Sequence, residues 1–180
     1  MLSKVTVVVT GIVIVVLINF SIWQKQNHLT KGEEIVLELA PVDPRSIMQG
    51  DYMRLDYQLS RKIRSQLSGK PSSNIDNQIS QILSDTALDA HDGYVIVALD
   101  ENQVAKFVRL DDGQPLLETQ RKLQYRVRGS VVKFATNAYF FEEGLEPVFR
   151  DARYGAFKLN KDGEVLLTHL LDENMTMLGE

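Results

Sequence analysis

The feature that most constrains this chain is an uncharged apolar run near its N-terminus. Val5 to Trp23 holds nineteen residues without a single charge. As a helix rising about 1.5 Å per residue, such a run is long enough to cross the ~30 Å hydrocarbon core of a bilayer. The sequence therefore predicts that residues 5–23 form a single membrane-spanning helix, with the bilayer as the first partner of this chain.

The end of this run favours an uncleaved signal anchor over a cleaved signal peptide. A signal peptide has a shorter apolar core and ends in small residues. Here the run ends in Phe20, Ile22 and Trp23, and Trp23 fits the headgroup level of a membrane interface. We therefore expect a membrane anchor over residues 1–24, a juxtamembrane linker over 25–32 and a soluble domain over 33–180.

Charges flanking the run indicate the orientation. Lys4 and the α-amino group precede it, whereas Lys25 and Lys31 follow and are soon balanced by acidic residues. Long soluble domains translocate largely regardless of their own charge. We expect a single-pass protein of the cell (inner) membrane whose soluble domain is extracytoplasmic or periplasmic.

The soluble region is acidic and of single-domain size. From residue 25 onward it carries 19 of the 20 Lys and Arg and all 24 Asp and Glu, a net charge of −5. Nucleic-acid binding requires a basic face that displaces counterions from phosphates. The net negative charge of this region therefore argues against a nucleic-acid partner. Its length is sufficient for one domain with a hydrophobic core.

Period-two alternation of apolar and polar residues predicts a mainly β domain. The expected strands are 35–39, 53–59, 94–99, 104–110, a long one over 123–134, 157–159 and 165–167. Polar connections at Asp100 to Gln103 and Asn160 to Gly163 indicate two hairpins.

One segment departs from this pattern. Apolar residues at helical spacing over 72–90 predict an amphipathic helix that ends at His91-Asp92-Gly93. The predicted fold is therefore a transmembrane helix followed by a β-sandwich or barrel-like, α+β domain, with a helical insertion at about residues 60–92.

A short motif lies between the first two predicted strands. Gly50 to Tyr57 reads G-D-Y-x-x-L-x-Y, with Pro-Val-Asp-Pro-Arg-Ser upstream at 41–46 and Ala-Arg-Tyr-Gly downstream at 152–155. These residues resemble the GDYXXLXY family of membrane-anchored proteins. The resemblance spans most of residues 33–172 and implies a single-pass anchored domain without an assigned chemistry, often associated with polytopic membrane proteins.

Strand parity divides the motif into two sets. Leu55 and Tyr57 share a face with Met53 and are expected in the core, as structural residues. The remaining motif residues are harder to explain as core and form our candidate binding set: Asp43, Arg45, Ser46, Gly50, Asp51, Tyr52, Arg54, Asp56 and Tyr154.

The residues do not assemble a recognisable catalytic or metal-binding motif. Ser46 with a lysine base, or the Asp51 and Asp56 carboxylates, would be the centre of an envelope hydrolase, but no base is placed by a second motif. The three histidines are isolated, and Asp111-Asp112-Gly113 is better explained as a turn than as a calcium loop. We predict no catalytic residue, metal or cofactor.

The sequence therefore favours a binding or assembly module for a polytopic membrane protein over an enzyme. An envelope hydrolase, of the Ser/Lys peptidase type or based on carboxylates, is the alternative.

Overall fold

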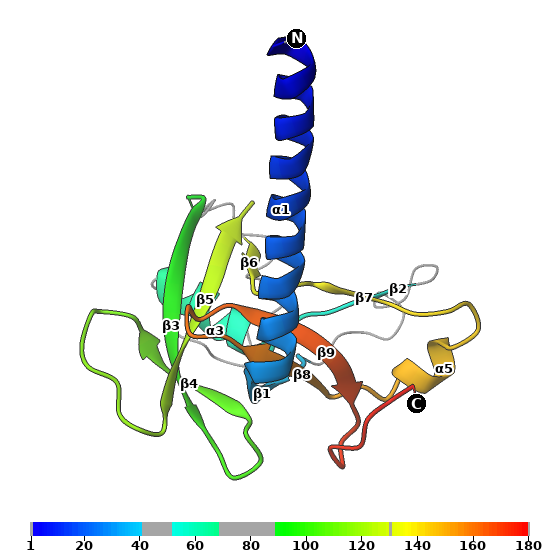
Figure 1. Cartoon of the computed structure of the whole chain (residues 1–180). Helices are drawn as coiled ribbons and strands as arrows, with labels where there is room; N and C mark the ends of the chain where they lie inside the picture. Colours follow the sequence, from blue (N-terminus) through cyan, green and yellow to red (C-terminus); the bar gives the residue numbers. More distant parts are fainter. Residues whose placement is uncertain (1, 41–51, 69–88, 130, 180) are drawn as a thin grey trace. The chain divides into compact units, whose positions relative to one another are not determined.

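The computed structural model describes residues 2–40, 52–68, 89–129 and 131–179 (Figure 1). The chain divides into two compact units, residues 1–32 and 33–180. Their positions relative to one another are not determined, so each unit is described by itself.

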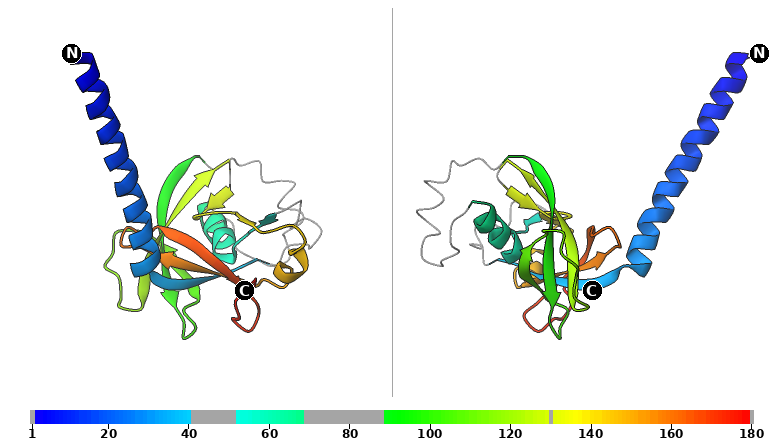
Figure 2. Two further views of the ribbon diagram at one scale, coloured as in Figure 1. Left: turned by 45° about the vertical axis from the view of Figure 1, so that its right-hand side comes forward. Right: turned by 90° about the vertical axis from the view of Figure 1, so that its left-hand side faces the viewer.

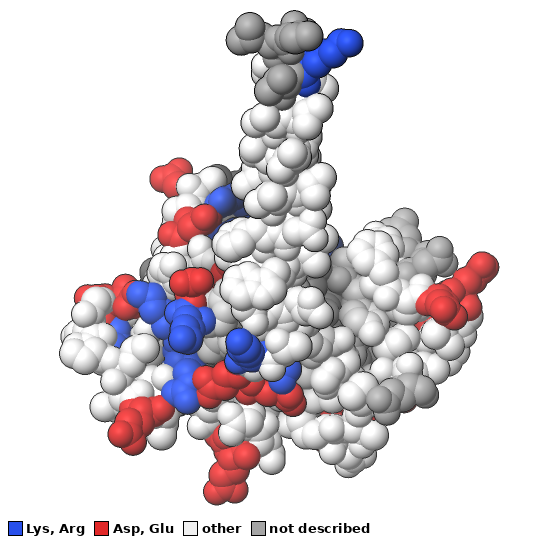
Figure 3. All heavy atoms as spheres, viewed as in Figure 1, with Lys and Arg blue, Asp and Glu red and all other residues white. Residues whose placement is uncertain are grey.

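The first unit is one helix, α1 (Leu2–Lys31). Among the described residues, Thr6–Lys31 is the segment with the length and hydropathy of a membrane-crossing helix. Its large apolar side chains, from Val7 to Trp23, are exposed on every side, as expected of a helix without a polar face. Figure 3 shows the upper part of this helix with uncharged side chains, below the basic atoms near its N-terminal end.

Polar side chains in α1 bond to the helix backbone. Asn19 donates from Nδ2 to the carbonyl of Val15 at 2.9 Å, and Thr30 donates from Oγ1 to the carbonyl of Gln26 at 2.9 Å. Such bonds to the preceding turn satisfy polar groups that water would otherwise solvate.

The second unit is mainly β, as predicted, and its strands form two larger sheets and a ribbon. The first sheet has the order β1-β8-β9, built from β1 (Glu33–Glu38), β8 (Tyr154–Leu159) and β9 (Val165–Leu171). The second has the order β4-β3-β5-β6, built from β4 (Ala105–Leu110), β3 (His91–Leu99), β5 (Gln120–Arg128) and β6 (Val131–Lys133). The two-stranded β2–β7 ribbon pairs β2 (Tyr52–Arg54) with β7 (Ala138–Phe140).

Strand β1 connects the two larger sheets into an open half-barrel (Figure 2). It pairs with β8 along its whole length, and Val36 donates its backbone N–H to the carbonyl of Gln103 at 2.9 Å. Ile35 and Leu37 point from β1 into the main core and are fully buried. Helix α3 (Gln58–Leu67) contacts β1, β4 and β6 and inserts Leu59 and Ile63 into this core, while the short α5 (Glu146–Phe149) inserts Phe149.

Both predicted hairpins are present. Asp100 to Gln103 joins β3 to β4, and the Asp100 carboxylate accepts the backbone N–H of Asn102 and of Val104, both at 2.9 Å. Asn160 to Gly163 joins β8 to β9, and Asn160 Oδ1 accepts the backbone N–H of Asp162 and of Glu164 in the same manner.

Two predicted strands are shorter than expected. The strand expected over 53–59 ends at Arg54, and α3 begins at Gln58 because Leu59, Ile63 and Leu67 form an apolar stripe with a spacing of four residues. The long strand expected over 123–134 is two strands, β5 and β6, separated at Gly129, whose φ of +55° favours glycine.

The predicted helix lies mostly outside the described residues. Residues 72–88 are not described, and the described helix of this region is α3, at 58–67. His91-Asp92-Gly93 does not end a helix, because these residues begin β3. Gly93 pairs with Tyr125 across the sheet, and a Cβ atom on Gly93 would lie 2.6 Å from the Tyr125 hydroxyl, so the glycine makes room for this ring.

The β8–β9 hairpin turn contacts the second sheet. Gly163 accepts a hydrogen bond of 2.7 Å from the backbone N–H of Gln124 in β5. Gly163 has a φ of +86°, and a Cβ atom there would lie 2.9 Å from the Lys122 carbonyl oxygen. This position therefore requires glycine both for its backbone conformation and for its close contact.

We predict that Gly163→Ala destabilises the fold more than Gly144→Ala. Gly144 has a similar φ of +88°, but a Cβ atom added there would meet nothing within 4 Å, so its substitution carries the backbone cost of roughly 1–2 kcal/mol alone. Gly163→Ala should cost about 1–3 kcal/mol more, because the methyl group overpacks β5. Thermal unfolding followed by circular dichroism measures the difference, and equal losses would show that the turn is not packed against β5.

Candidate functional site

The described part of the motif is Tyr52 to Tyr57, which contains β2 and the turn into α3. Five predicted site residues lie outside the described residues: Asp43, Arg45, Ser46, Gly50 and Asp51. The candidate site is therefore built from the β2–β7 ribbon and the residues that attach it to the core.

The inward half of the motif attaches this ribbon to the core. Met53, Leu55 and Tyr57 are buried, and Tyr57 is 0% exposed. The Tyr57 ring meets Phe134 and Phe157 edge-on, with centroids 6.0 and 5.8 Å away. Such edge-to-face contacts add to the stabilisation that aromatic burial provides.

Three polar groups of this inward half bond to the segment at Thr136 and Asn137. The Tyr57 hydroxyl donates to the carbonyl of Thr136 at 2.8 Å. The Leu55 N–H donates to the carbonyl of Asn137 at 2.8 Å, and Asn137 returns a bond from Nδ2 to the carbonyl of Leu55 at 3.3 Å. Burial, with a smaller effect from the Asp56 carboxylate, raises the pKa of Tyr57 well above its usual value, so the hydroxyl stays a donor at neutral pH.

The outward half of the motif faces solvent. Tyr52 pairs with Phe140 across the ribbon, with ring centroids 5.7 Å apart and planes tilted by 40°. Tyr52 is 37% exposed and Phe140 is 74% exposed, so this aromatic pair has an open face. A phenylalanine left this exposed buries little apolar area and therefore contributes little to the stability of the fold.

Charged motif residues flank this aromatic pair along the chain. Arg54 is exposed at the end of β2. Asp56 forms an ion pair with Arg61 of α3, with Asp56 Oδ2 2.8 Å from Nη2 and 2.9 Å from Nε. Because both partners are substantially exposed, this pair contributes little to the stability of the fold.

Tyr154 lies away from this ribbon. It begins β8, pairs with Glu38 on one side and Leu171 on the other, and packs against a small apolar cluster on the face of the β1–β8–β9 sheet opposite the main core. The contacts of the described residues do not bring Tyr154 together with Tyr52, Arg54 or Asp56. Its membership in one site with them therefore stays a prediction.

The hydrolase alternative gains no support from the described residues. Ser46 and Asp51 lie outside them, whereas Asp56 is paired with Arg61. Lys106, one of the lysines available as a base, pairs with Glu38 at 3.3 Å. Across the described ranges, no group of three His, Asp or Glu side chains is arranged to hold a metal ion.

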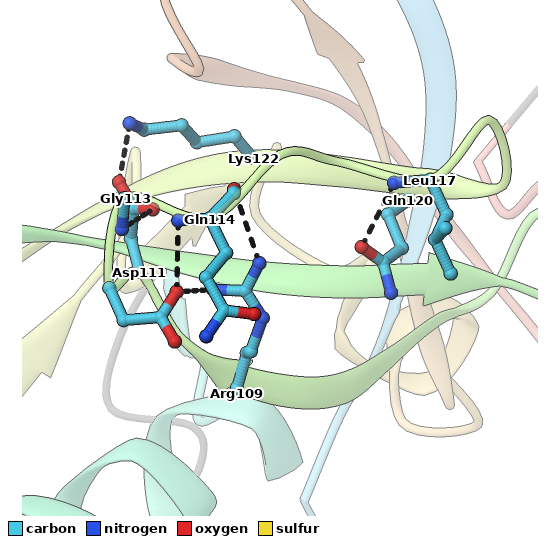
Figure 4. Close-up of polar contacts among 8 residues, drawn as sticks. Arg109, Asp111, Gly113, Gln114, Leu117, Gln120 and Lys122 are labelled. Atoms are coloured by element: carbon cyan, nitrogen blue, oxygen red, sulfur yellow. Dashed lines mark hydrogen bonds and ion pairs between the residues drawn. The ribbon is translucent and has the colours of Figure 1, made fainter.

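The connection between β4 and β5 is a second surface feature, and sequence reasoning identified only its turn. Asp111 Oδ1 accepts the backbone N–H of Gly113 at 3.2 Å, and the Asp111 carboxylate pairs with Lys122 at 2.5 Å (Figure 4). The Lys122 and Gly113 contacts hold the pKa of Asp111 below its usual value. Asp112 pairs with Arg109, so both carboxylates belong to the turn, as predicted for this segment.

This ordered turn precedes two exposed leucines. Leu116 and Leu117 are exposed, Leu117 by 66%, and the Leu117 N–H donates to Gln120 Oε1 at 3.2 Å. Around this connection, acidic and basic side chains of β1, β4, β5 and β8 gather on one face and largely neutralise one another in ion pairs (Figure 3). The Tyr52–Phe140 pair lies on a different part of the molecule, because the β2–β7 ribbon and this connection are on opposite sides of the half-barrel (Figure 1).

The two tyrosines of the motif should respond differently to loss of the hydroxyl. We predict that Tyr57→Phe costs about 1–2 kcal/mol, because it leaves the Thr136 carbonyl without its donor. Tyr57→Ala should cost about 3–5 kcal/mol through lost burial and a cavity. The matched control, Tyr52→Phe, should change the free energy of unfolding by less than about 0.5 kcal/mol. Equal effects of the two Phe substitutions in thermal unfolding would contradict this division of the motif.

Comparison with known proteins agrees with the family resemblance that this motif indicated. No curated protein and no solved structure matches the chain significantly. The family model described as "GDYXXLXY protein" matches residues 14–170, which include the second half of α1, the ribbon and both larger sheets except the last residue of β9. Since this match covers most of the chain, the protein belongs to the GDYXXLXY family.

Proposed function

We propose that this protein is a membrane-anchored binding or assembly module that docks on a polytopic membrane protein through the outward half of its motif. The observation that carries this proposal is the exposed Tyr52–Phe140 pair on a ribbon whose other side is locked into the core.

The proposed anchor is α1, acting as an uncleaved signal anchor. Its 30 residues correspond to about 45 Å of helix, more than the hydrocarbon core requires. Asn19 lies within the apolar stretch, and its bond to the Val15 carbonyl lowers the cost of placing an amide among lipids. An anchored domain meets its partners at the membrane surface, which favours another membrane protein.

The aromatic pair is proposed as the centre of the contact. Binding energy at protein interfaces concentrates in a few aromatic and arginine side chains that become desolvated on association. Tyr52 and Phe140 are such aromatics, and Arg54 follows in the same strand as Tyr52. Because Tyr57 and Leu55 hold the motif in place from within, the ribbon presents these side chains with little loss of conformational entropy.

A photo-crosslinking experiment tests the contact. The photoreactive residue p-benzoylphenylalanine replaces Phe140 in the full chain in living cells, and Leu117 is replaced as the matched control because its exposure is comparable. We expect the Phe140 position to give a discrete adduct in the membrane fraction, containing a protein with several membrane spans. The adduct should be lost when Tyr52→Ala is combined with it. An adduct of equal yield from the Leu117 position, or none from Phe140, would contradict the proposal.

The proposed extracytoplasmic placement of the soluble domain has a separate test. The chain contains no cysteine, so single cysteines can be introduced at chosen sites. Glu101→Cys lies in the exposed β3–β4 turn and should react with a membrane-impermeant maleimide in intact cells or spheroplasts. Lys4→Cys, the control before the apolar stretch, should react only after lysis. The reverse pattern would place the domain in the cytoplasm.

A further inference from the structure

The face of the β1–β8–β9 sheet opposite the main core, here called the outer face, carries a second apolar cluster. Val36, Val104, Ala156 and Leu171 are buried there, with Met175 packed against them. The strand register places Val36 opposite Ala156 and Ala156 opposite His169, so these three residues form a row across the sheet. A histidine therefore stands at the end of an otherwise apolar row.

This row contains a hollow. Val36 and His169, at the two ends of the row, line this hollow, whereas Ala156 between them is fully buried. A pocket of about 250 Å³ opens at this place, lined by His169, Met175 and Met177 together with Val36 and Leu171. Two thioether sulfurs and one imidazole thus share a single small pocket.

The turn after β9 positions both methionines over this hollow. Asp172 accepts the backbone N–H groups of Asn174 and Thr176 at 2.8 Å each, and Met175 N–H donates to the carbonyl of Asp172 at 3.2 Å. Met177 forms a β-bridge with Leu171. Since Leu171 and His169 are two residues apart in β9, this bridge places Met177 beside the face on which His169 lies.

Met175 adopts an unusual backbone conformation in this turn. Its φ is +63°, a region that non-glycine residues rarely occupy. Glycine or asparagine would adopt this conformation with less strain. Such strain is frequent where a side chain must be held at a particular place. This turn therefore has a methionine at a position where the backbone conformation favours glycine or asparagine.

We propose that His169, Met175 and Met177 form a binding site for Cu(I) on the outer face of the β1–β8–β9 sheet. Thioether sulfur is a soft ligand that selects Cu(I), and imidazole nitrogen binds copper as well. Two further polar residues line the pocket: Glu34, which is paired with Lys158 at 3.0 Å, and Asn102. Their carboxylate and amide oxygens are hard donors, which suit Mg²⁺ and Ca²⁺ rather than Cu(I). A set of two sulfurs and one nitrogen does not suit Ca²⁺ or Mg²⁺, which require oxygen.

The simpler role for two methionines in an apolar pocket is to fill space. Leucine would serve that role about equally well, because leucine and methionine have similar volumes. Met177 is also 39% exposed, so a role in filling space inside the protein explains little of its position. The substitution of methionine by leucine therefore separates metal binding from packing.

The test is a Cu(I) titration of the full chain in detergent, under reducing conditions, against a chromophoric Cu(I) chelator. We expect the protein to withdraw one Cu(I) per chain, and Met175→Leu, Met177→Leu and His169→Asn each to lower the affinity by about tenfold or more. Zn²⁺ and Ca²⁺ in excess should not displace the ion. Because the chain has no cysteine, thiolate binding does not obscure the result.

Matched controls use the same substitutions elsewhere. Met53→Leu changes a buried methionine of the main core, and His91→Asn changes a histidine at the start of β3; both should bind Cu(I) as the wild type does. Thermal unfolding of each variant shows whether it is folded. Wild-type affinity in folded Met175→Leu and Met177→Leu, or an equal loss in Met53→Leu, would overturn the site.

X-ray absorption of the Cu(I)-loaded protein gives a readout independent of affinity. We expect two sulfur neighbours and one nitrogen neighbour around copper in the wild type, and one sulfur fewer in Met177→Leu. A first shell of nitrogen and oxygen alone would also overturn the site.

Discussion

The second unit depends on β1, a strand of the first sheet that also contacts the second sheet through a bridge between Val36 and Val104. Its backbone pairs with β8, and Val36 bonds to Gln103 at the turn between β3 and β4. Its glutamates form ion pairs with three different strands: Glu33 with Arg121, Glu34 with Lys158 and Glu38 with Lys106. These pairs are exposed and contribute little free energy. Burial of Ile35 and Leu37 therefore contributes more to holding the half-barrel together than these ion pairs do.

Because β1 connects the two larger sheets, the motif that follows it lies beside the core and contributes both buried and exposed side chains. Leu39 bridges Tyr57, and Ala40 N–H bonds to the Asp56 carbonyl, so the end of the motif returns to the strand that precedes it. The period-two alternation then sends Tyr57 inward and leaves Tyr52 outward. The motif is thus a structural attachment on one side and, in our proposal, a docking surface on the other.

The same strand gives the first sheet two apolar faces. Ile35 and Leu37 face the main core, whereas Val36 belongs to the smaller outer cluster with Ala156 and Leu171. A sheet that faces solvent on one side normally places polar residues there. In this molecule the outer face combines the charged pair of Glu34 and Lys158 with an apolar cluster, one histidine and the two methionines of the following turn. The Cu(I) site is inferred from the histidine and the two methionines.

Local pattern alone determined several parts of this protein: the apolar length of residues 5–23, the two hairpins, and the inward position of Leu55 and Tyr57. These features depend on neighbours within a few residues, which the hydrophobic period and the turn residues reveal directly.

Other features of the structure were decided by contacts between residues that are distant in sequence. The pairing of β2 with β7, which places Phe140 beside Tyr52, depends on residues far apart along the chain. The place where α3 begins and the break at Gly129 depend on how helix and strands pack around the core. The meeting of His169 with Met175 and Met177 required the β-bridge to Leu171, because spacing in the sequence does not show that a turn folds back over a strand.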